Sequence, residues 1–105
     1  MDMSITLDAD WTTRTIKSFE EVIKFNLGIA SDWYIDVTDH PKDELLDHRI
    51  KLHGDTFFYE TFSNALLPVF IKDYFLKLGV DGIRKKFDNK FTSVYIYKKT
   101  THSVP

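Results

Sequence analysis

The chain has 105 residues, 43% of them apolar and 29% charged, a formal net charge of −2 and no cysteine. The lack of cysteine excludes disulfide frameworks, thiolate zinc sites and cysteine nucleophiles, and sixteen aromatics (nine Phe, five Tyr, two Trp) with four glycines and three prolines exclude a disordered chain. We expect one globular domain over 1–105 with a single core and a frayed tail over 101–105.

Two elements are expected in the N-terminal part. Apolar and polar residues alternate over 4–8, which indicates a short strand. The sequence from Ser18 to Glu21 has the pattern of a capping box, because a serine hydroxyl can accept from the third amide while the glutamate reaches back. A helix is therefore predicted over 19–27, with Gly28 as its stop.

The middle of the chain predicts a strand, a short helix and a hairpin. The run from Trp33 to Thr38 is rich in β-branched and aromatic residues, which is typical of a strand. A short helix is expected from Pro41 to 47 or 48, since proline is favoured at the first helical position. The hairpin is predicted to join strands 49–53 and 56–62 through the turn Gly54-Asp55.

The segment 67–78 has the clearest helical pattern, and Gly79 follows it where a C-terminal cap belongs. Its polar strip is narrow, so we expect this helix to be buried on most sides. The predicted apolar stripe consists of Leu67, Phe70, Ile71, Tyr74, Phe75 and Leu78.

The C-terminal part is predicted to hold a short helix over 80–91, capped by Asp81, although Asp88-Asn89 could instead form the tip of a hairpin. A strand is predicted over 91–99, with large side chains on both of its faces. The expected fold is α+β, a mainly antiparallel sheet with two principal helices packed on one face.

No motif in the sequence supports an enzyme, a metal site or a cofactor. There is no Gly-x-Ser-x-Gly, no Walker phosphate loop and no His-Glu-x-x-His. His40, Glu44 and His48 have helical spacing, but Pro41 places His40 outside regular helix. The N-terminus lacks the features of a signal peptide, and the apolar runs are too short to cross a bilayer. We expect a cytoplasmic, non-enzymatic protein without a membrane segment.

The net charge is the sum of two unlike halves. Residues 1–60 hold 13 acidic and 6 basic residues, a charge of −7, whereas residues 61–105 hold 3 and 8, a charge of +5. Two electrostatic faces, or two copies meeting head to tail, would use this asymmetry. The favoured alternative is that the two halves lie beside each other in one fold and neutralise one another.

The leading functional hypothesis is a small interaction module, of the inhibitor, immunity or regulatory-adaptor type, that docks a partner protein through an acidic and aromatic surface. Aromatic anchors and the acidic residues around the short helix would supply this surface. The candidate residues are Trp11, Trp33, Tyr34, Asp36, Asp39, Asp43, Glu44 and Asp47.

The alternative hypothesis is binding of single-stranded nucleic acid by the basic C-terminal part. Cations neutralise phosphates and neighbouring aromatic rings stack on bases. Gly79 to Gly82 has the Gly-x-x-Gly spacing of a KH loop, but Asp81 would repel phosphate, so we expect no KH domain. The candidate residues are Arg84, Lys85, Lys86, Lys90, Phe91, Tyr95, Tyr97, Lys98 and Lys99.

Overall fold

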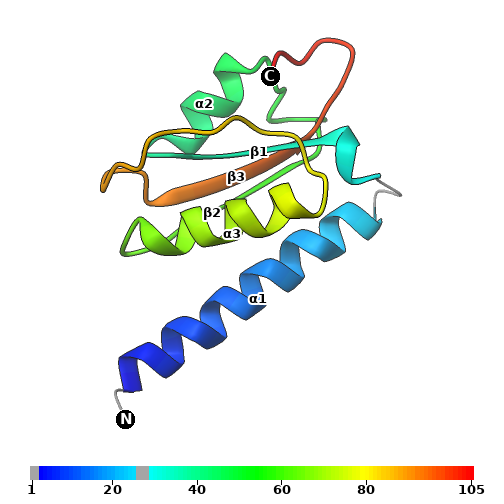
Figure 1. Cartoon of the computed structure of the whole chain (residues 1–105). Coiled ribbons are helices and arrows are strands. Elements are labelled where there is room, and N and C mark those ends of the chain that lie inside the picture. The colour runs from blue at the N-terminus through cyan, green and yellow to red at the C-terminus, as the bar shows by residue number, and fades with distance from the viewer. Residues whose placement is uncertain (1–2, 26–28) are drawn as a thin grey trace.

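The computed structural model describes residues 3–25 and 29–105, and the side chains of 13–24 and 29–105 (Figure 1). Its three strands form an antiparallel sheet in the order β1-β3-β2, so the last strand of the chain lies in the middle. The elements are α1 (Met3–Phe25), the 3-10 turn η1 (Ala30–Asp32), β1 (Trp33–Thr38), α2 (Pro41–Asp47), β2 (Phe57–Thr61), α3 (Leu66–Lys77) and β3 (Ser93–Lys98).

The helices cover both faces of this sheet, which confirms the α+β class. The two principal helices, α1 and α3, lie on one face, and the short α2 lies on the other (Figure 1). Val94 and Ile96 of β3 face α1 and α3, in a first core that includes Phe19 of α1 and Phe75 of α3. None of the described helices is long and apolar enough to cross a bilayer.

The opposite face of β3 is also covered. Tyr95 and Tyr97 alternate with the residues of the first core and pack with Tyr34, Leu45 of α2 and Ile50. Both tyrosines are fully buried. The large side chains on the two faces of this strand therefore belong to two cores, the first core on the side of α1 and α3 and a second core, around the two tyrosines, on the side of α2.

The N-terminal part is one long helix, so the predicted strand over 4–8 is wrong. The helix α1 also runs through Ser18, which removes the predicted capping box. The physical reason is that residues 3–25 contain no glycine or proline, and the packing of the buried Phe19 stabilises one continuous helix. The predicted stop at Gly28 lies outside the described residues.

The predicted hairpin forms only in its second half. The strand over 56–62 is present as β2, but it pairs with β3, and residues 49–53 are turns. Arg49 has a φ of 63°, which breaks any strand there. The amide of Lys51 donates to Asp55 Oδ2 at 2.6 Å, and the amide of Asp55 donates to the Lys51 carbonyl at 3.0 Å. These two bonds close a local turn instead of a ladder.

The segment after α3 is extended and irregular, so the predicted helix over 80–91 is wrong. Gly79, with a φ of 102°, ends α3 as predicted. Asp81 then pairs with the edge of β1, since its amide donates to the Trp33 carbonyl and its carbonyl accepts from the Ile35 amide, both at 2.9 Å. These bonds take the backbone groups that a helix would use. A turn does form at Asp88, whose carbonyl accepts from the Phe91 amide at 3.1 Å.

The tail expected to fray is held by hydrogen bonds. The amide of Val104 donates to the His48 carbonyl at 2.9 Å, and the Val104 carbonyl contacts His48 Nδ1. Asp55 contacts His102 Nε2 at 2.7 Å. The C-terminus therefore packs beside the end of α2, over the second core.

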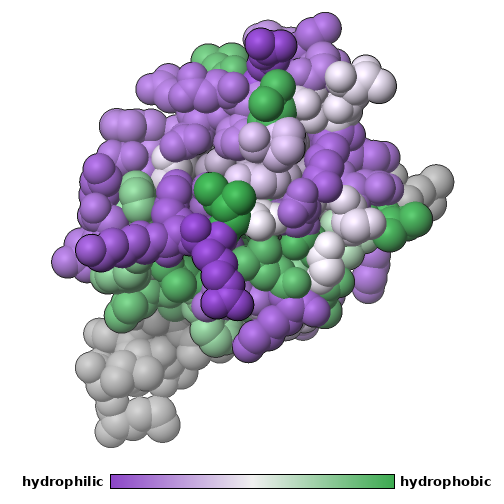
Figure 2. Space-filling view, turned by 45° about the horizontal axis from the view of Figure 1, so that its top comes forward, coloured by the Kyte–Doolittle hydropathy of each residue, from purple (hydrophilic) through white to green (hydrophobic). Residues whose placement is uncertain are grey.

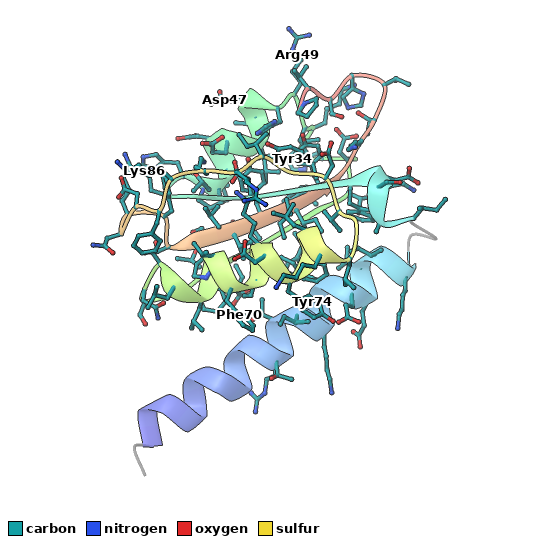
Figure 3. The ribbon with its side chains drawn as sticks, viewed as in Figure 1. Tyr34, Asp47, Arg49, Phe70, Tyr74 and Lys86 are labelled. Atoms are coloured by element: carbon teal, nitrogen blue, oxygen red, sulfur yellow. The ribbon has the colours of Figure 1, made fainter. Side chains whose placement is uncertain are left out.

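The buried face of α3 is turned slightly from its predicted stripe, because Leu67, Ile71, Tyr74 and Phe75 lie in or against the first core while Phe70 and Leu78 are exposed. Its buried positions are Pro68, Ile71, Lys72 and Phe75, at helical spacing, whereas Phe70 of the predicted stripe is 58% exposed. Figure 3 shows Phe70 directed away from the sheet. The buried face thus includes a lysine in place of an aromatic residue.

This rotation gives a matched pair of truncations on one helix. We expect Phe75→Ala to lower the free energy of unfolding by about 3–5 kcal/mol, because it leaves a cavity in the first core. Phe70→Ala should cost less than about 1 kcal/mol, since its ring is mostly in water. Urea denaturation of the two variants measures the difference. Equal losses would contradict the rotation of α3.

Candidate functional site

The predicted acidic and aromatic surface does not form as one surface. Trp33 and Tyr34 are 0% and 2% exposed, and Asp36 is buried beside them on β1. A partner docking on this conformation cannot reach them, which corrects their role as surface anchors. They are buried because helices and their side chains cover both faces of β1. The side chain of Trp11 lies outside the described residues.

The acidic residues around α2 remain near the surface. Asp43 and Asp47 are exposed, and Figure 3 shows Asp47 at the outer side of the helix. Glu44 is half-buried and accepts a hydrogen bond from the Thr38 hydroxyl at 3.3 Å. Asp39 lies 3.2 Å from His40 Nε2. This group is a solvated helix face rather than an enclosed site.

The predicted basic and aromatic segment is divided by the fold. Tyr95 and Tyr97 are buried on the α2 side of β3 and cannot stack on a base, which corrects their predicted role. Lys99 directly follows the C-terminal end of β3, where its ammonium contacts Asp81 at 3.0 Å and the Ser31 carbonyl at 2.9 Å. Lys98 ends β3 next to it and is half-buried.

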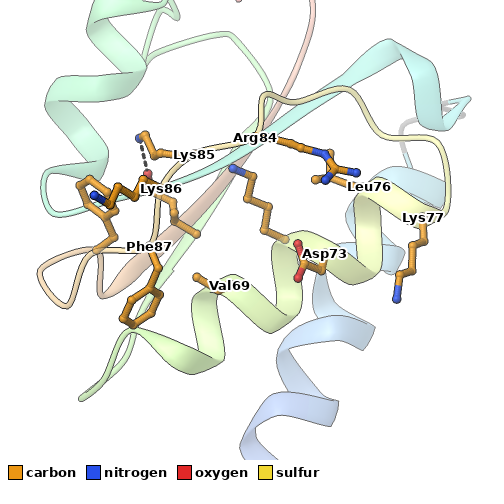
Figure 4. A pocket seen from close by; sticks show the side chains of 11 residues that line it. Val69, Asp73, Leu76, Lys77, Arg84, Lys85, Lys86 and Phe87 are labelled. Carbon is orange, nitrogen blue, oxygen red and sulfur yellow. Dashed lines mark hydrogen bonds between the residues drawn. The ribbon is translucent and has the colours of Figure 1, made fainter.

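The remaining part of that segment forms one wall of a cleft. The cleft has a volume of about 550 Å³ and lies between α3 and the residues 84–91 (Figure 4). Lys90 is exposed beside it and lies over the ring of Phe91. The cations that line the cleft are Lys72, Lys77, Arg84, Lys85 and Lys86.

The cleft also has an apolar lining. Val69 and Leu76 of α3 and Phe87 and Phe91 of the opposite wall line the cleft, and Figure 4 shows Phe87 close to Val69 and Leu76 beside Arg84. Phe87 is 48% exposed, so its ring is accessible. On the face shown in Figure 2, most of the hydrophobic side chains lie in the lower part of the view, and a few others lie among the hydrophilic side chains above them. The cleft can therefore offer both ionic and apolar contacts to one ligand.

A buried ionic network forms the floor of the cleft. The Lys72 ammonium donates to Asp36 Oδ1 at 2.9 Å, and both side chains are almost fully buried. Lys85 approaches the other oxygen, Oδ2, at 3.2 Å and donates to the Val37 carbonyl at 2.9 Å. One carboxylate thus joins two ammonium groups, from α3 and from the segment after it. The network holds the two walls in place and carries a net charge of +1.

Several of these residues escaped the sequence-based predictions. Lys72, Asp73 and Lys77 lie on the helix predicted over 67–78, whose pattern indicates a structural role. One signal was available, a lysine beside the strongest apolar stripe and an aspartate inside an apolar strand. Buried charges of opposite sign need each other, so these two exceptions could have been paired.

The histidines do not gather into a metal site in the part of the chain that the structure describes. His48 Nε2 lies 2.9 Å from the Tyr95 hydroxyl and 3.8 Å from Glu44, and its Nδ1 lies 3.2 Å from the Tyr97 hydroxyl. His40 precedes α2 and contacts Asp39. His48 therefore belongs to the second core and its contact with the tail.

The buried ion pair generates a first prediction for this site. Asp36→Asn should lower the free energy of unfolding by about 3–5 kcal/mol, because it leaves two neighbouring ammonium groups without their carboxylate. Asp36→Leu combined with Lys72→Met should lose less, because it removes both of the most buried charges and leaves only Lys85, whose side chain is 25% exposed, without its carboxylate. Urea denaturation measures both. The exposed pair offers the control, and Asp81→Asn should cost less than about 1 kcal/mol.

A second prediction concerns alkaline pH. Burial raises the pKa of Tyr34 to about 12, and the Asp36 carboxylate adds to the effect. Burial also raises the pKa values of Tyr95 and Tyr97. A raised pKa in the folded state stabilises the fold below the unfolded value of about 10, and this stability is lost as the pH rises through the folded pKa.

The free energy of unfolding should therefore decline between about pH 10 and 12. Tyr34→Phe should reduce the slope of that decline, because it removes one of the tyrosines that ionise more readily in the unfolded chain. Ultraviolet absorbance of tyrosinate and urea denaturation, both followed against pH, measure the effect. A stability that stays constant over this range would contradict it.

The chain matches no protein-family model, no curated protein and no solved structure. Its function therefore has to be inferred from the chemistry of its own surface. The feature with the most specific chemistry is the cleft, where cations and an exposed phenyl ring surround a buried ionic floor.

Proposed function

We propose that the chain is a non-enzymatic binding module for single-stranded nucleic acid, and that the cleft between α3 and residues 84–91 is its binding site. The observation that carries the proposal is the concentration of five cations around one concave, partly apolar surface. With Asp73 and the underlying Asp36 as the opposing carboxylates, the cleft has a net charge of +3.

Phosphate recognition would come from the rim of the cleft. Arg84 and Lys86 are exposed, and a guanidinium can donate two parallel hydrogen bonds to one phosphate. Lys77 lies on the α3 side, so cations approach the cleft from both walls. Neutralising several phosphates in this way favours binding at low salt.

Base stacking would come from Phe87. Two ammonium groups lie near the ring of Phe91, Lys85 at 4.6 Å and Lys90 at 5.5 Å from its centroid. Phe91 thus helps to hold the cations in position. Phe87 is more exposed, and a base could stack on its accessible face. A single strand is favoured over a duplex because stacking on a side chain requires a base that is unstacked from its neighbours.

A docking site for a partner protein on α2 is the second candidate function, in line with the leading hypothesis from the sequence. The observation in its favour is that Leu46 is 53% exposed between the acidic residues Asp43 and Asp47. An exposed leucine within acidic surroundings suits a basic partner with an apolar pocket. This surface does not overlap the cleft, so the two candidates can be tested separately.

The proposal predicts a charge-specific loss of binding. We expect a labelled single-stranded oligonucleotide to bind at low salt, and Arg84→Glu with Lys86→Glu to weaken binding by about tenfold or more. The slope of log K against log salt should fall by roughly 1 to 1.5, because two phosphate contacts are lost. Both substituted residues are exposed, so the fold should persist. Fluorescence anisotropy at several salt concentrations measures affinity and slope.

Matched controls separate the cleft from general electrostatics. Arg49→Glu with Lys51→Glu makes the same change in net charge at exposed positions, and Figure 3 shows Arg49 on the side away from Lys86. This control should keep most of the affinity. If both double variants lose affinity equally, the cleft is not the binding site. If the wild-type protein binds no oligonucleotide at low salt, the nucleic-acid function is wrong and α2 is the remaining candidate.

A further inference from the structure

The floor of the cleft has hydrogen-bond donors that the protein does not use. The Lys72 ammonium has three N–H bonds, and among the described residues its hydrogen bond is to Asp36 Oδ1. Its side chain is only 6% exposed, yet it lines the cleft. Lys85 beside it forms an ion pair with Asp36 Oδ2 at 3.2 Å and donates to the Val37 carbonyl. The floor therefore combines unused donors with one uncompensated positive charge.

Such a floor favours an anionic oxygen as its ligand. A buried ammonium is costly unless its charge and its N–H groups are matched. Asp36 matches one of the two ammonium groups, and an oxyanion between Lys72 and Lys85 would match the other. Because the side chains of Lys72 and Lys85 are largely removed from water, the same ionic contact is stronger here than at the exposed rim.

We propose that Lys72 and Lys85 form a subsite for a terminal phosphate group, so that the cleft binds the phosphorylated end of a strand. This inference rests on the proposed function of the cleft and specifies its ligand. The terminal nucleotide would place its phosphate on the floor, and the rest of the strand would leave along the rim past Arg84 and Lys86.

The size of the cleft argues for an end of the strand. A volume of about 550 Å³ lies within the range of pockets that hold one small molecule, which is the scale of a single nucleotide. An internal phosphate is joined to a nucleotide on each side, so the strand would have to both enter and leave the floor between Lys72 and Lys85. A terminal phosphate continues on one side only. It also carries a charge of about −1.5 to −2 near neutral pH, against −1 for an internal phosphate.

The test compares three versions of one short oligonucleotide, with a phosphate on the first nucleotide, on the last nucleotide, or on neither. We expect one phosphorylated version to bind the wild-type protein about tenfold or more tightly than the unphosphorylated strand. This preference should decline as the pH falls below about 6, where the terminal phosphate gains a proton. Fluorescence anisotropy with each labelled strand measures the preference.

The double variant Asp36→Leu with Lys72→Met isolates the floor. It removes one carboxylate and one ammonium, so its net charge is unchanged and any loss of preference is not due to overall electrostatics. The ratio of its affinities for the phosphorylated and the unphosphorylated strand should fall to about one, whatever its affinity for the unphosphorylated strand. Should it fail to fold, wild-type protein with inorganic phosphate as competitor is the second measurement. At equal ionic strength, inorganic phosphate should then displace more of the phosphorylated strand than sodium chloride does.

The outcomes separate the subsite from the function of the whole cleft. If all three strands bind equally, the terminal-phosphate subsite is wrong and nucleic-acid binding stands. If none binds, both proposals fail. A phosphoserine peptide that binds more tightly than any of the strands would overturn the assignment of nucleic acid as the ligand while keeping the phosphate subsite.

Discussion

The contact between the Asp36 carboxylate and the Lys72 ammonium connects the sheet to α3, on the face of this helix that also buries Ile71 and Phe75. Taking two charges out of water is costly, so the pair is tolerated only where its geometry is held and further hydrogen bonds support it. Lys85 and the amide of Val37, which donates to Asp36 Oδ1 at 2.8 Å, supply that support. The helix buries the side that carries Lys72, and Phe70 turns to solvent.

The same network explains how an irregular segment can form a wall of the cleft. Residues 80–92 belong to no helix or strand, yet Asp81 is hydrogen-bonded to the edge of β1 and Lys85 forms an ion pair with Asp36. Lys85 also lies over the ring of Phe91, which anchors the far end. A loop tied at several points can hold side chains in place before a ligand arrives, and less ordering free energy is then lost on binding.

Elements with strong local signals could be predicted from the sequence, and elements set by distant contacts could not. The strand from Trp33 to Thr38 and the cap at Gly79 follow from residue type alone. The helix predicted over 80–91 does not form, because its apolar side chains Ile83 and Phe87 are about half exposed and the backbone at Asp81 pairs with β1 instead. The cleft was only half predictable. Its basic wall is contiguous in sequence, but the floor joins Asp36 to Lys72, 36 residues apart.

The charge asymmetry of the sequence is partly cancelled in the fold, as the favoured alternative expected. The acidic half supplies Asp36 to two lysines and Asp55 to His102. A sum over each half counts these compensated charges and therefore overstates the two faces. What remains is a local excess of +3 at the cleft on a chain with a net charge of −2. Since charges are screened beyond about 10 Å at moderate salt, a ligand at the cleft responds to this local excess and not to the overall charge.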